Sequence, residues 1–173
     1  MIEKIIIAGS GGQGIMLIGK VLAQAAMEYG LQVTWLPAYG AEVRGGTAHC
    51  MVILSDTQIG SPRVEKADII IALNQPSLAK FAGRLREGGI LIVNSSLAKS
   101  GAPANSIKCP FTDIAVQLGN VKVANMVSLG CLIRHKRVVP VKNIAEIIKK
   151  MAPKDKPQLA EVNQAALKKG LGL

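Results

Sequence analysis

A glycine-rich turn between an apolar strand and an apolar helix constrains the fold of this chain more than any other feature. Residues 4–8 contain a run of isoleucines that predicts a buried strand. The turn Gly9-Ser10-Gly11-Gly12-Gln13-Gly14 follows directly. Residues 15–29 are small or apolar on nearly all sides and predict a helix that Gly30 ends. The chain therefore opens as a strand, a tight loop and a well-covered helix.

Strand and helix signals continue to alternate after this start. Further strands are expected at residues 31–36 (ended by Pro37), 49–54, 69–73, 90–93 and 108–109. Further helices are expected from Pro76 to about Arg86 (ended by Gly88-Gly89), after a cap at Thr112, at residues 123–135 and 140–151, and at residues 155–169 before Gly170. The alternation predicts an α/β fold with a mostly parallel sheet, helices on both faces and C-terminal helices. We expect a single domain over residues 1–173.

Several segments directly follow predicted strands. They are the glycine loop, residues 39–46, Asn74-Gln75 and Asn94-Ser95. Ligands of such sheets gather at the carboxyl ends of the strands. We therefore expect these segments to lie at the same edge of the sheet.

The glycine loop allows two interpretations. Gly9, Gly11 and Gly14 satisfy the G-x-G-x-x-G pattern of Rossmann-like dinucleotide sites, and the start of the following helix could hold an anion. Such a site also needs an acidic residue at the end of the second strand to hold the ribose, but this strand ends in Thr34-Trp35-Leu36-Pro37. The loop therefore indicates either an NAD(P)- or FAD-binding oxidoreductase or glycines that allow tight packing against a neighbour.

Arg44 lies in a segment with little side-chain obstruction. Gly45 and Gly46 follow it, so its guanidinium could approach a carboxylate or phosphate, with Tyr39 adding a hydrogen bond. The alternative is a local ion pair between Glu42 and Arg44 on a solvated loop, which would contribute little.

Other kinds of site are disfavoured by the sequence. There is no G-x-x-x-x-G-K-[ST] loop, which argues against a nucleotide triphosphatase. Cys50, Cys109 and Cys131 form no C-x-x-C pair, so neither a zinc nor an iron–sulfur site is indicated. His49 and His135 are expected to be structural or surface residues. Because neighbours in a strand point to opposite faces, we expect no thiol–imidazole pair between Cys50 and His49.

Hydropathy and charge bear on location and partners. No apolar stretch approaches the roughly 20 residues that span a bilayer, and no basic leader precedes an apolar run, so we expect a soluble cytoplasmic protein without membrane contact. The net charge is +10, and from Arg134 onward ten Lys or Arg against three acidic residues give +7 of it. These charges are either solvated lysines or a face for an acidic protein or anionic cofactor. Without interleaved aromatics, nucleic acid is not expected.

Motifs in a fixed order resemble the gamma subunits of 2-oxoacid:ferredoxin oxidoreductases. They are the glycine loop, the Tyr-Gly-Ala-Glu-Val-Arg-Gly-Gly sequence of residues 39–46, Ala67-Asp68 leading to Ala72-Leu73-Asn74-Gln75, and Asn125-Met126-Val127-Ser128-Leu129-Gly130. The resemblance covers nearly the whole chain. The chain looks most like the 2-oxoglutarate type, with the pyruvate and branched-chain types close behind.

The resemblance implies a multisubunit enzyme that oxidatively decarboxylates a 2-oxoacid to acyl-CoA and carbon dioxide. Such enzymes use thiamine diphosphate, Mg²⁺, [4Fe-4S] clusters and coenzyme A, and pass electrons to ferredoxin. This chain lacks clustered cysteines and a Gly-Asp-Gly motif followed by Asn, so we expect it to bind none of these cofactors alone and to supply no catalytic residue. Alpha, beta and delta-type subunits would carry these groups.

The resemblance also implies a set of interface or ligand-proximal residues: Gly9, Gly11, Gly12, Gln13, Gly14, Tyr39, Glu42, Arg44, Gly45, Gly46, Asn74 and Asn125. Arg44 is expected to reach an anionic group of coenzyme A or a partner carboxylate, and Glu42 to help fix the interface. The rival interpretations are a free-standing dinucleotide-dependent oxidoreductase and a purely structural interaction module. The isolated chain could self-associate through surfaces meant for its partners.

Overall fold

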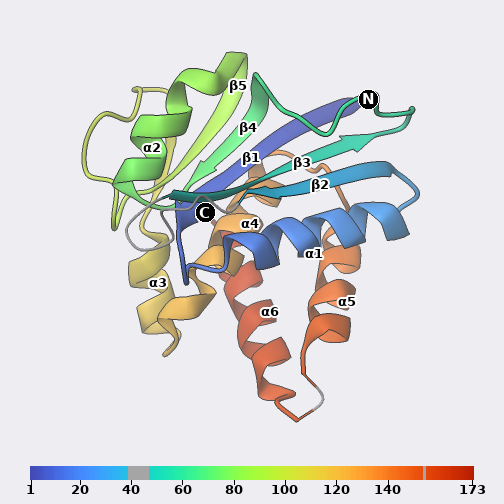
Figure 1. Cartoon of the computed structure of the whole chain (residues 1–173). Helices are drawn as coiled ribbons and strands as arrows, with labels where there is room; N and C mark the ends of the chain where they lie inside the picture. Colours follow the sequence, from blue (N-terminus) through green and yellow to red (C-terminus); the bar gives the residue numbers. More distant parts are fainter. Residues whose placement is uncertain (39–46, 154) are drawn as a thin grey trace.

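The computed structural model of the chain describes residues 1–38, 47–153 and 155–173. The strands form a six-stranded sheet in the order β2-β3-β1-β4-β5-β6 (Figure 1). Their bounds are β1 (Ile2–Ser10), β2 (Gln32–Ala38), β3 (Thr47–Ser55), β4 (Ala67–Ala72), β5 (Leu85–Asn94) and β6 (Ile107–Cys109). β1, β4, β5 and β6 are parallel, whereas β3 is antiparallel to both β1 and β2. The predicted α/β fold with a mostly parallel sheet is confirmed.

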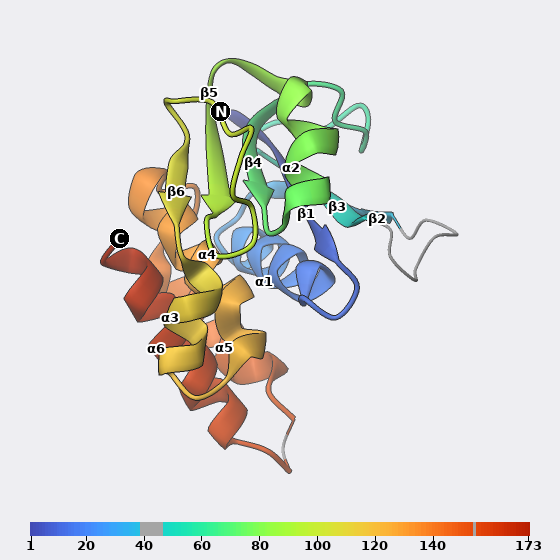
Figure 2. The ribbon, with the colours of Figure 1, turned by 90° about the vertical axis from the view of Figure 1, so that its left-hand side faces the viewer.

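Helices cover both faces of the sheet, as predicted. On one face lies α2 (Gln75–Phe81), followed by the short 3₁₀ turn η1 (Ala82–Arg84). The other face carries α1 (Ile15–Glu28), α3 (Phe111–Gln117), the 3₁₀ turn η2 (Val121–Val123), α4 (Ala124–His135), α5 (Val141–Met151) and α6 (Gln158–Leu171). Figure 2 shows β6 at the edge of the sheet running directly into α3. The sheet therefore separates two unequal helical layers.

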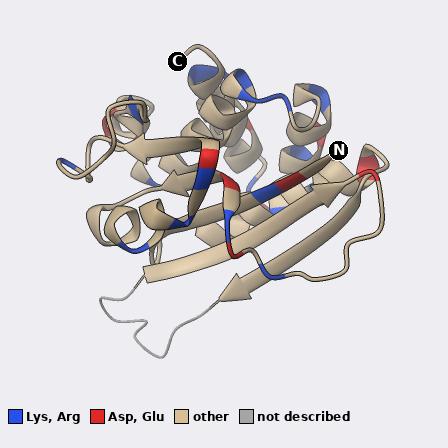
Figure 3. Cartoon of the chain, turned by 90° about the horizontal axis from the view of Figure 1, so that it is seen from above, with Lys and Arg blue, Asp and Glu red and all other residues tan. Residues whose placement is uncertain are grey.

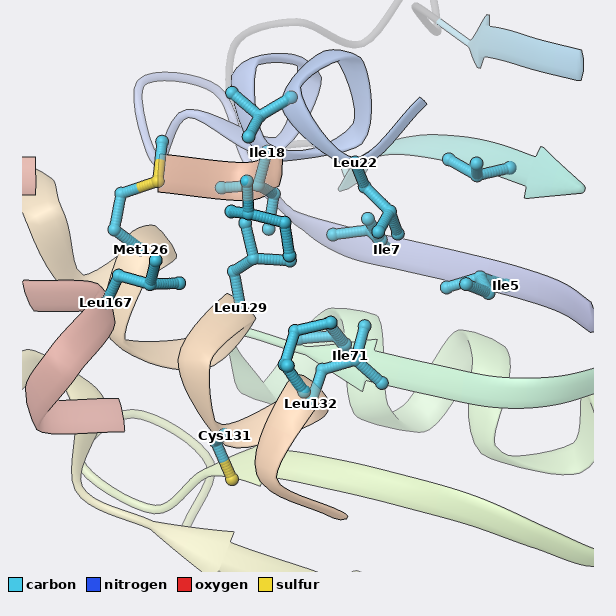
Figure 4. Close-up of a cluster of buried hydrophobic side chains, with 14 of the residues drawn as sticks. Ile5, Ile7, Ile18, Leu22, Ile71, Met126, Leu129, Cys131, Leu132 and Leu167 are labelled. Carbon is cyan, nitrogen blue, oxygen red and sulfur yellow. The ribbon is translucent and has the colours of Figure 1, made fainter. Parts of the chain in front are cut away.

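The core is almost wholly aliphatic. Successive residues of a strand face opposite helical layers, and because both layers cover the sheet, residues on both faces of the central strands are apolar. Ile7 of β1 packs in the larger core with Ile18 of α1 and Leu132 of α4 (Figure 4), whereas its neighbour Ile6 packs in the smaller core under α2. Every residue of β4 is buried. Hydrophobic packing on both faces thus fixes the sheet that carries the candidate site.

Two glycines allow α4 and α6 to cross at backbone contact. A Cβ on Gly130 would overlap the carbonyl oxygen of Leu167, and a Cβ on Gly170 would overlap that of Val127. The prediction that the last helix stops before Gly170 is wrong, because Gly170 lies inside α6 and faces Gly130. The close crossing is what seats α6 against the larger core.

Pro37 does not end β2, contrary to the sequence-based prediction. β2 continues to Ala38, and Pro37 lies opposite Cys50 of β3. β2 is an edge strand, and an edge strand tolerates proline because its outward backbone groups need no partner strand.

Gly88 and Gly89 do not end a helix, contrary to the sequence-based prediction. The helical segment ends at Arg84, and both glycines lie inside β5. A Cβ on Gly89 would lie 2.9 Å from the carbonyl oxygen of Asp68, and the pairing of β4 with β5 shifts register at this point. The glycines therefore permit a bulge and a close approach of two strands.

None of the helices in the described ranges is long and apolar enough to cross a membrane.

Replacing Gly130 with alanine should lower the free energy of unfolding by about 1–3 kcal/mol, because the added methyl group must displace the backbone of α6. Gly60→Ala is the matched control, since a Cβ on Gly60 meets no atom within 4 Å. Urea unfolding followed by circular dichroism measures both variants. Equal stability of the two would contradict the close crossing of α4 and α6.

Candidate functional site

The carboxyl ends of β1, β4 and β5 meet at one edge of the sheet, where the carbonyl oxygen of Leu73 joins them. Gln13 Nε2 donates to this oxygen at 3.4 Å, and Asn94 Nδ2 donates to it at 3.1 Å. The Leu73 N–H in turn donates to the carbonyl oxygen of Ala8 at 2.8 Å. We call this region the carboxyl edge. The expected convergence is confirmed for the glycine loop and the segments that begin at Asn74 and Asn94.

The side chain of Gln13 closes the glycine loop. Gln13 folds back so that its Oε1 accepts from the Ser10 N–H at 2.7 Å. A Cβ on Gly9 would lie 2.6 Å from Gln13 Oε1 and from Ile15 Cδ1, so only glycine fits there without displacing them. Gly12 has a φ of 87°, a conformation that favours glycine. Gly11 and Gly12 are exposed, which leaves their backbone available to another molecule.

Asn125 fastens the glycine loop to α4. Its Nδ2 donates to the carbonyl oxygen of Gly14 at 3.2 Å, and its Oδ1 accepts from the Met126 N–H at 2.7 Å. Gly14 is the N-cap of α1 with a φ of 70°, and a Cβ there would overlap Asn125 Nδ2. Asn125 is buried, with 2% of its surface exposed. It therefore positions the loop from within.

Other polar side chains stiffen the same edge. Asn74 is the N-cap of α2, and its Oδ1 accepts from the Ser77 N–H at 2.9 Å. Asn94 Nδ2 also donates to Thr112 Oγ1 at 2.9 Å. The prediction that Thr112 caps a helix is wrong, because Pro110 occupies the N-cap of α3. Sequence reasoning placed Asn94 at this edge but missed its bonding role, although an asparagine that directly follows an apolar strand is a usable signal.

The strand order argues against the dinucleotide interpretation. In a Rossmann-type site the second strand lies beside the first, so that its acidic residue reaches the ribose of the bound dinucleotide. Here β3 lies between β1 and β2 and runs antiparallel to both. The end of β2 is therefore a full strand further from the loop, and the tight-packing interpretation of the glycines agrees better with the contacts of Gly9 and Gly14.

Tyr39, Glu42, Arg44, Gly45 and Gly46 lie outside the described residues. The residues on either side of this segment are placed: Ala38 pairs with His49, and Thr47 pairs with Ser10 at the end of β1. The chain therefore re-enters the described structure beside the glycine loop, one strand away from Ala38, where it leaves.

His49 and Cys50 are not arranged for nucleophilic chemistry. His49 packs on the ring of Phe81 with centroids 4.7 Å apart, and burial lowers its pKa, helped by the charges of Lys80 and Arg84. Cys50 lies in the opposite core, which confirms the expected absence of a pair with His49. Burial raises the pKa of the Cys50 thiol to about 12, so it stays protonated near neutral pH.

Metal ligands are likewise not gathered in the described part of the chain, where no group of three or more His, Cys, Asp or Glu side chains could hold an ion. The residues present therefore do not fit an iron–sulfur cluster, whose ligands are grouped cysteines. What this edge offers instead is rigid backbone, glycine and amide groups.

Comparison with known proteins gives this arrangement a family. Residues 4–173 match the family described as pyruvate ferredoxin/flavodoxin oxidoreductase. The chain is 35% identical over 180 residues to 2-oxoglutarate synthase subunit KorC of Methanothermobacter marburgensis, which spans 98% of this chain and 95% of that protein. It is also similar, with 31% identity and a TM-score of 0.82, to the crystal structure of the keto/oxoacid ferredoxin oxidoreductase gamma subunit from Geobacter sulfurreducens PCA, covering 99% of both chains.

A further relative is much longer than this chain. Ketoisovalerate oxidoreductase subunit VorA of Methanothermobacter thermautotrophicus is 44% identical over 130 residues, which is 75% of this chain but only 27% of that protein. The chain thus spans about a quarter of this relative. The chain belongs to the pyruvate ferredoxin/flavodoxin oxidoreductase family. The resemblance to its gamma subunits, first seen in the motifs, is confirmed.

Removing the Asn125 amide should loosen the glycine loop. Asn125→Ala should lower the free energy of unfolding by about 1–3 kcal/mol, because the buried partners of the amide lose their hydrogen bonds. Hydrogen exchange should report the change at the Ile18 N–H, which donates to the Gly14 carbonyl oxygen. Asn105→Ala, at an exposed position, serves as the control. Unchanged exchange at Ile18 in Asn125→Ala would argue against the positioning role.

The raised thiol pKa of Cys50 predicts a loss of stability in alkali. Between its ordinary pKa of 9.0 and the folded value of about 12, the unfolded chain releases the Cys50 proton while the folded chain keeps it. Stability should therefore fall as pH rises, by about 1.4 kcal/mol per pH unit for this thiol. Cys50→Ala lacks this contribution, so its unfolding free energy should decline less steeply between pH 9 and 11 than that of the wild type. Parallel curves for the two proteins would refute it.

Proposed function

We propose that this chain acts as the gamma-type subunit of a multisubunit 2-oxoacid:ferredoxin oxidoreductase. The observation that carries the proposal is the similarity over nearly the full length of KorC and of the gamma subunit from Geobacter sulfurreducens. On this proposal residues 1–173 act as one domain, in the cytoplasm. The free-standing dinucleotide-dependent enzyme is not favoured, since neither the strand order nor these relatives support it.

The reaction proposed for the assembled enzyme is the oxidative decarboxylation of a 2-oxoacid to acyl-CoA and carbon dioxide, with electrons passed to ferredoxin. 2-Oxoglutarate, pyruvate and branched-chain acids are the candidate substrates, in keeping with the names of the relatives. Thiamine diphosphate, Mg²⁺ and [4Fe-4S] clusters would be held by alpha, beta and delta-type subunits. The described residues of this chain gather no ligand group that fits a metal.

The contribution of this chain is the carboxyl edge. Gly11 and Gly12 present exposed backbone there. Large apolar side chains on segments that leave the same edge are also exposed: Leu17, Leu97, Val116 and Val121. Apolar groups of this size gain free energy when another chain covers them. We therefore propose that the glycine loop packs against sister subunits near the active site, with Asn74 and Asn125 keeping it rigid, and that an isolated chain self-associates through these surfaces.

The segment that carries Tyr39, Glu42, Arg44, Gly45 and Gly46 is proposed to meet the same partners. Its flanking residues Ala38 and Thr47 lie beside the carboxyl edge. A guanidinium can hold a carboxylate or a phosphate through two parallel hydrogen bonds. Arg44 would use this geometry toward coenzyme A or a carboxylate of a sister subunit.

Arg44→Ala should reduce acyl-CoA formation by the assembled enzyme by roughly tenfold or more, because a hydrogen bond to a charged group contributes about 1.5–3 kcal/mol. Arg63→Ala removes the same charge at an exposed site without an ion pair among the described residues and should turn over like the wild type. Steady-state assays with 2-oxoglutarate, pyruvate and 2-ketoisovalerate give both the effect and the substrate. Wild-type assembly and turnover of Arg44→Ala would exclude this role.

A further inference from the structure

A hollow lies at the amino edge of the sheet, opposite the carboxyl edge. A cavity of about 660 Å³ is lined by Tyr29, Ile133, Arg134, Arg137, Val139, Pro140, Val141 and Leu171. These residues come from the C-terminal ends of α1, α4 and α6, from the connection between α4 and α5, and from the start of α5. The ion pair between Lys136 Nζ and Glu3 Oε1, at 2.8 Å, places the end of α4 beside the start of β1. We call this hollow the amino-edge pocket.

The polar side chains that line the amino-edge pocket carry no negative charge. Arg134 and Arg137 bring two guanidinium groups, and Tyr29 brings a hydroxyl. Within the described ranges neither arginine forms a salt bridge, and no hydrogen bond uses either guanidinium. Both arginines are exposed, and two positive charges that line one hollow favour an anion there.

Nearby acidic groups are already paired with other cations. Glu3 binds Lys136 at 2.8 Å, and Glu28, next to Tyr29 in sequence, binds Lys150 at 2.8 Å. Figure 3 shows Lys and Arg positions on the helices close to the C-terminus. These two carboxylates therefore form ion pairs with lysines, and neither forms an ion pair with an arginine of the pocket.

The start of α5 adds a further electropositive group to the pocket wall. Pro140 is the N-cap of this 11-residue helix, no side chain caps the helix, and no acidic residue lies in its first turn. The uncapped N–H groups and the helix dipole favour a negative charge at this place. Arg134, Arg137 and the helix start thus act on the same space.

The remaining walls are apolar. Apolar surface open to a ligand comes from Tyr29, Val141 and Leu171, which are exposed or partly exposed. Ile133 and Val139, each only 1% exposed, belong to the core beneath them. A volume of about 660 Å³ lies in the range of roughly 300–1,000 Å³ that is usual for small-molecule sites. A bare inorganic ion would leave these walls uncovered.

From this combination we infer that the amino-edge pocket binds a small organic anion, with its carboxylate or phosphate held by Arg134, Arg137 and the start of α5 and its apolar stem against Val141 and Leu171. The site is separate from the carboxyl edge and does not rest on the proposed function.

The test is a titration of the full chain with hexanoate, followed by two-dimensional NMR of backbone amides and arginine Nε–H groups. Hexan-1-ol, which has the same stem without the charge, and inorganic phosphate, which has the charge without the stem, are the comparison probes. Hexanoate should shift the signals of Val141, Lys142, Arg134 and Arg137 and bind more tightly than either probe.

Arg134→Ala/Arg137→Ala should weaken hexanoate binding at least tenfold, and the matched pair Lys108→Ala/Lys122→Ala, which loses the same charge elsewhere on the surface, should stay within twofold of the wild type. Arg134→Lys/Arg137→Lys keeps the charge and should retain part of the affinity, which guards against misfolding of the alanine variant. Hexanoate that binds no better than hexan-1-ol, or that binds wild type and the double alanine variant alike, would overturn the assignment.

Discussion

The hydrogen bond from Asn125 to the carbonyl oxygen of Gly14 is the contact on which the carboxyl edge depends. It joins residues 111 positions apart and links the first turn of α1 to the first turn of α4. The contact requires glycine at position 14, because a Cβ there would overlap the amide of Asn125 and because φ is positive. Gln13 and Asn94 extend the same restraint to β4 through the Leu73 carbonyl oxygen. The exposed backbone of Gly11 and Gly12 is thereby held on a rigid support.

Much of this fold could be predicted from the sequence, because strands and helices each have a characteristic period and the glycine loop marks the junction between them. The opposite orientation of His49 and Cys50 followed from strand geometry alone. The errors arose where a residue has two uses. Gly88, Gly89 and Gly170 looked like helix ends, yet they permit close approach of β5 to β4 and of α6 to α4. Such contacts depend on distant partners that local sequence does not reveal.

The candidate site shows the same division. Gly9 and Gly14 were recognised as special by spacing, and Asn125 only through resemblance to a family, since its partner lies in another part of the chain. The strand order, with β3 between β1 and β2, could not be read from the alternation of elements, although it is what distinguishes this loop from a dinucleotide site. Non-local pairing decides that order, and the local pattern is the same for both.

The two edges of the sheet differ in chemistry. The carboxyl edge presents glycine backbone, amides and exposed apolar side chains, whereas the amino-edge pocket presents two arginines and a helix start. The first suits a protein interface and the second a charged small molecule. One domain can carry both surfaces because its aliphatic core lies between the two edges.

The central claim is that sister subunits cover the glycine loop. Hydrogen–deuterium exchange of this chain, compared between the isolated state and the assembled enzyme, tests it most directly. The account predicts that the amides of Gly11 and Gly12, which are exposed in the isolated chain, exchange much more slowly after assembly, while those of exposed loops such as the one around Gly60 do not change. Stable incorporation of the chain with unchanged exchange at Gly11 and Gly12 would contradict it.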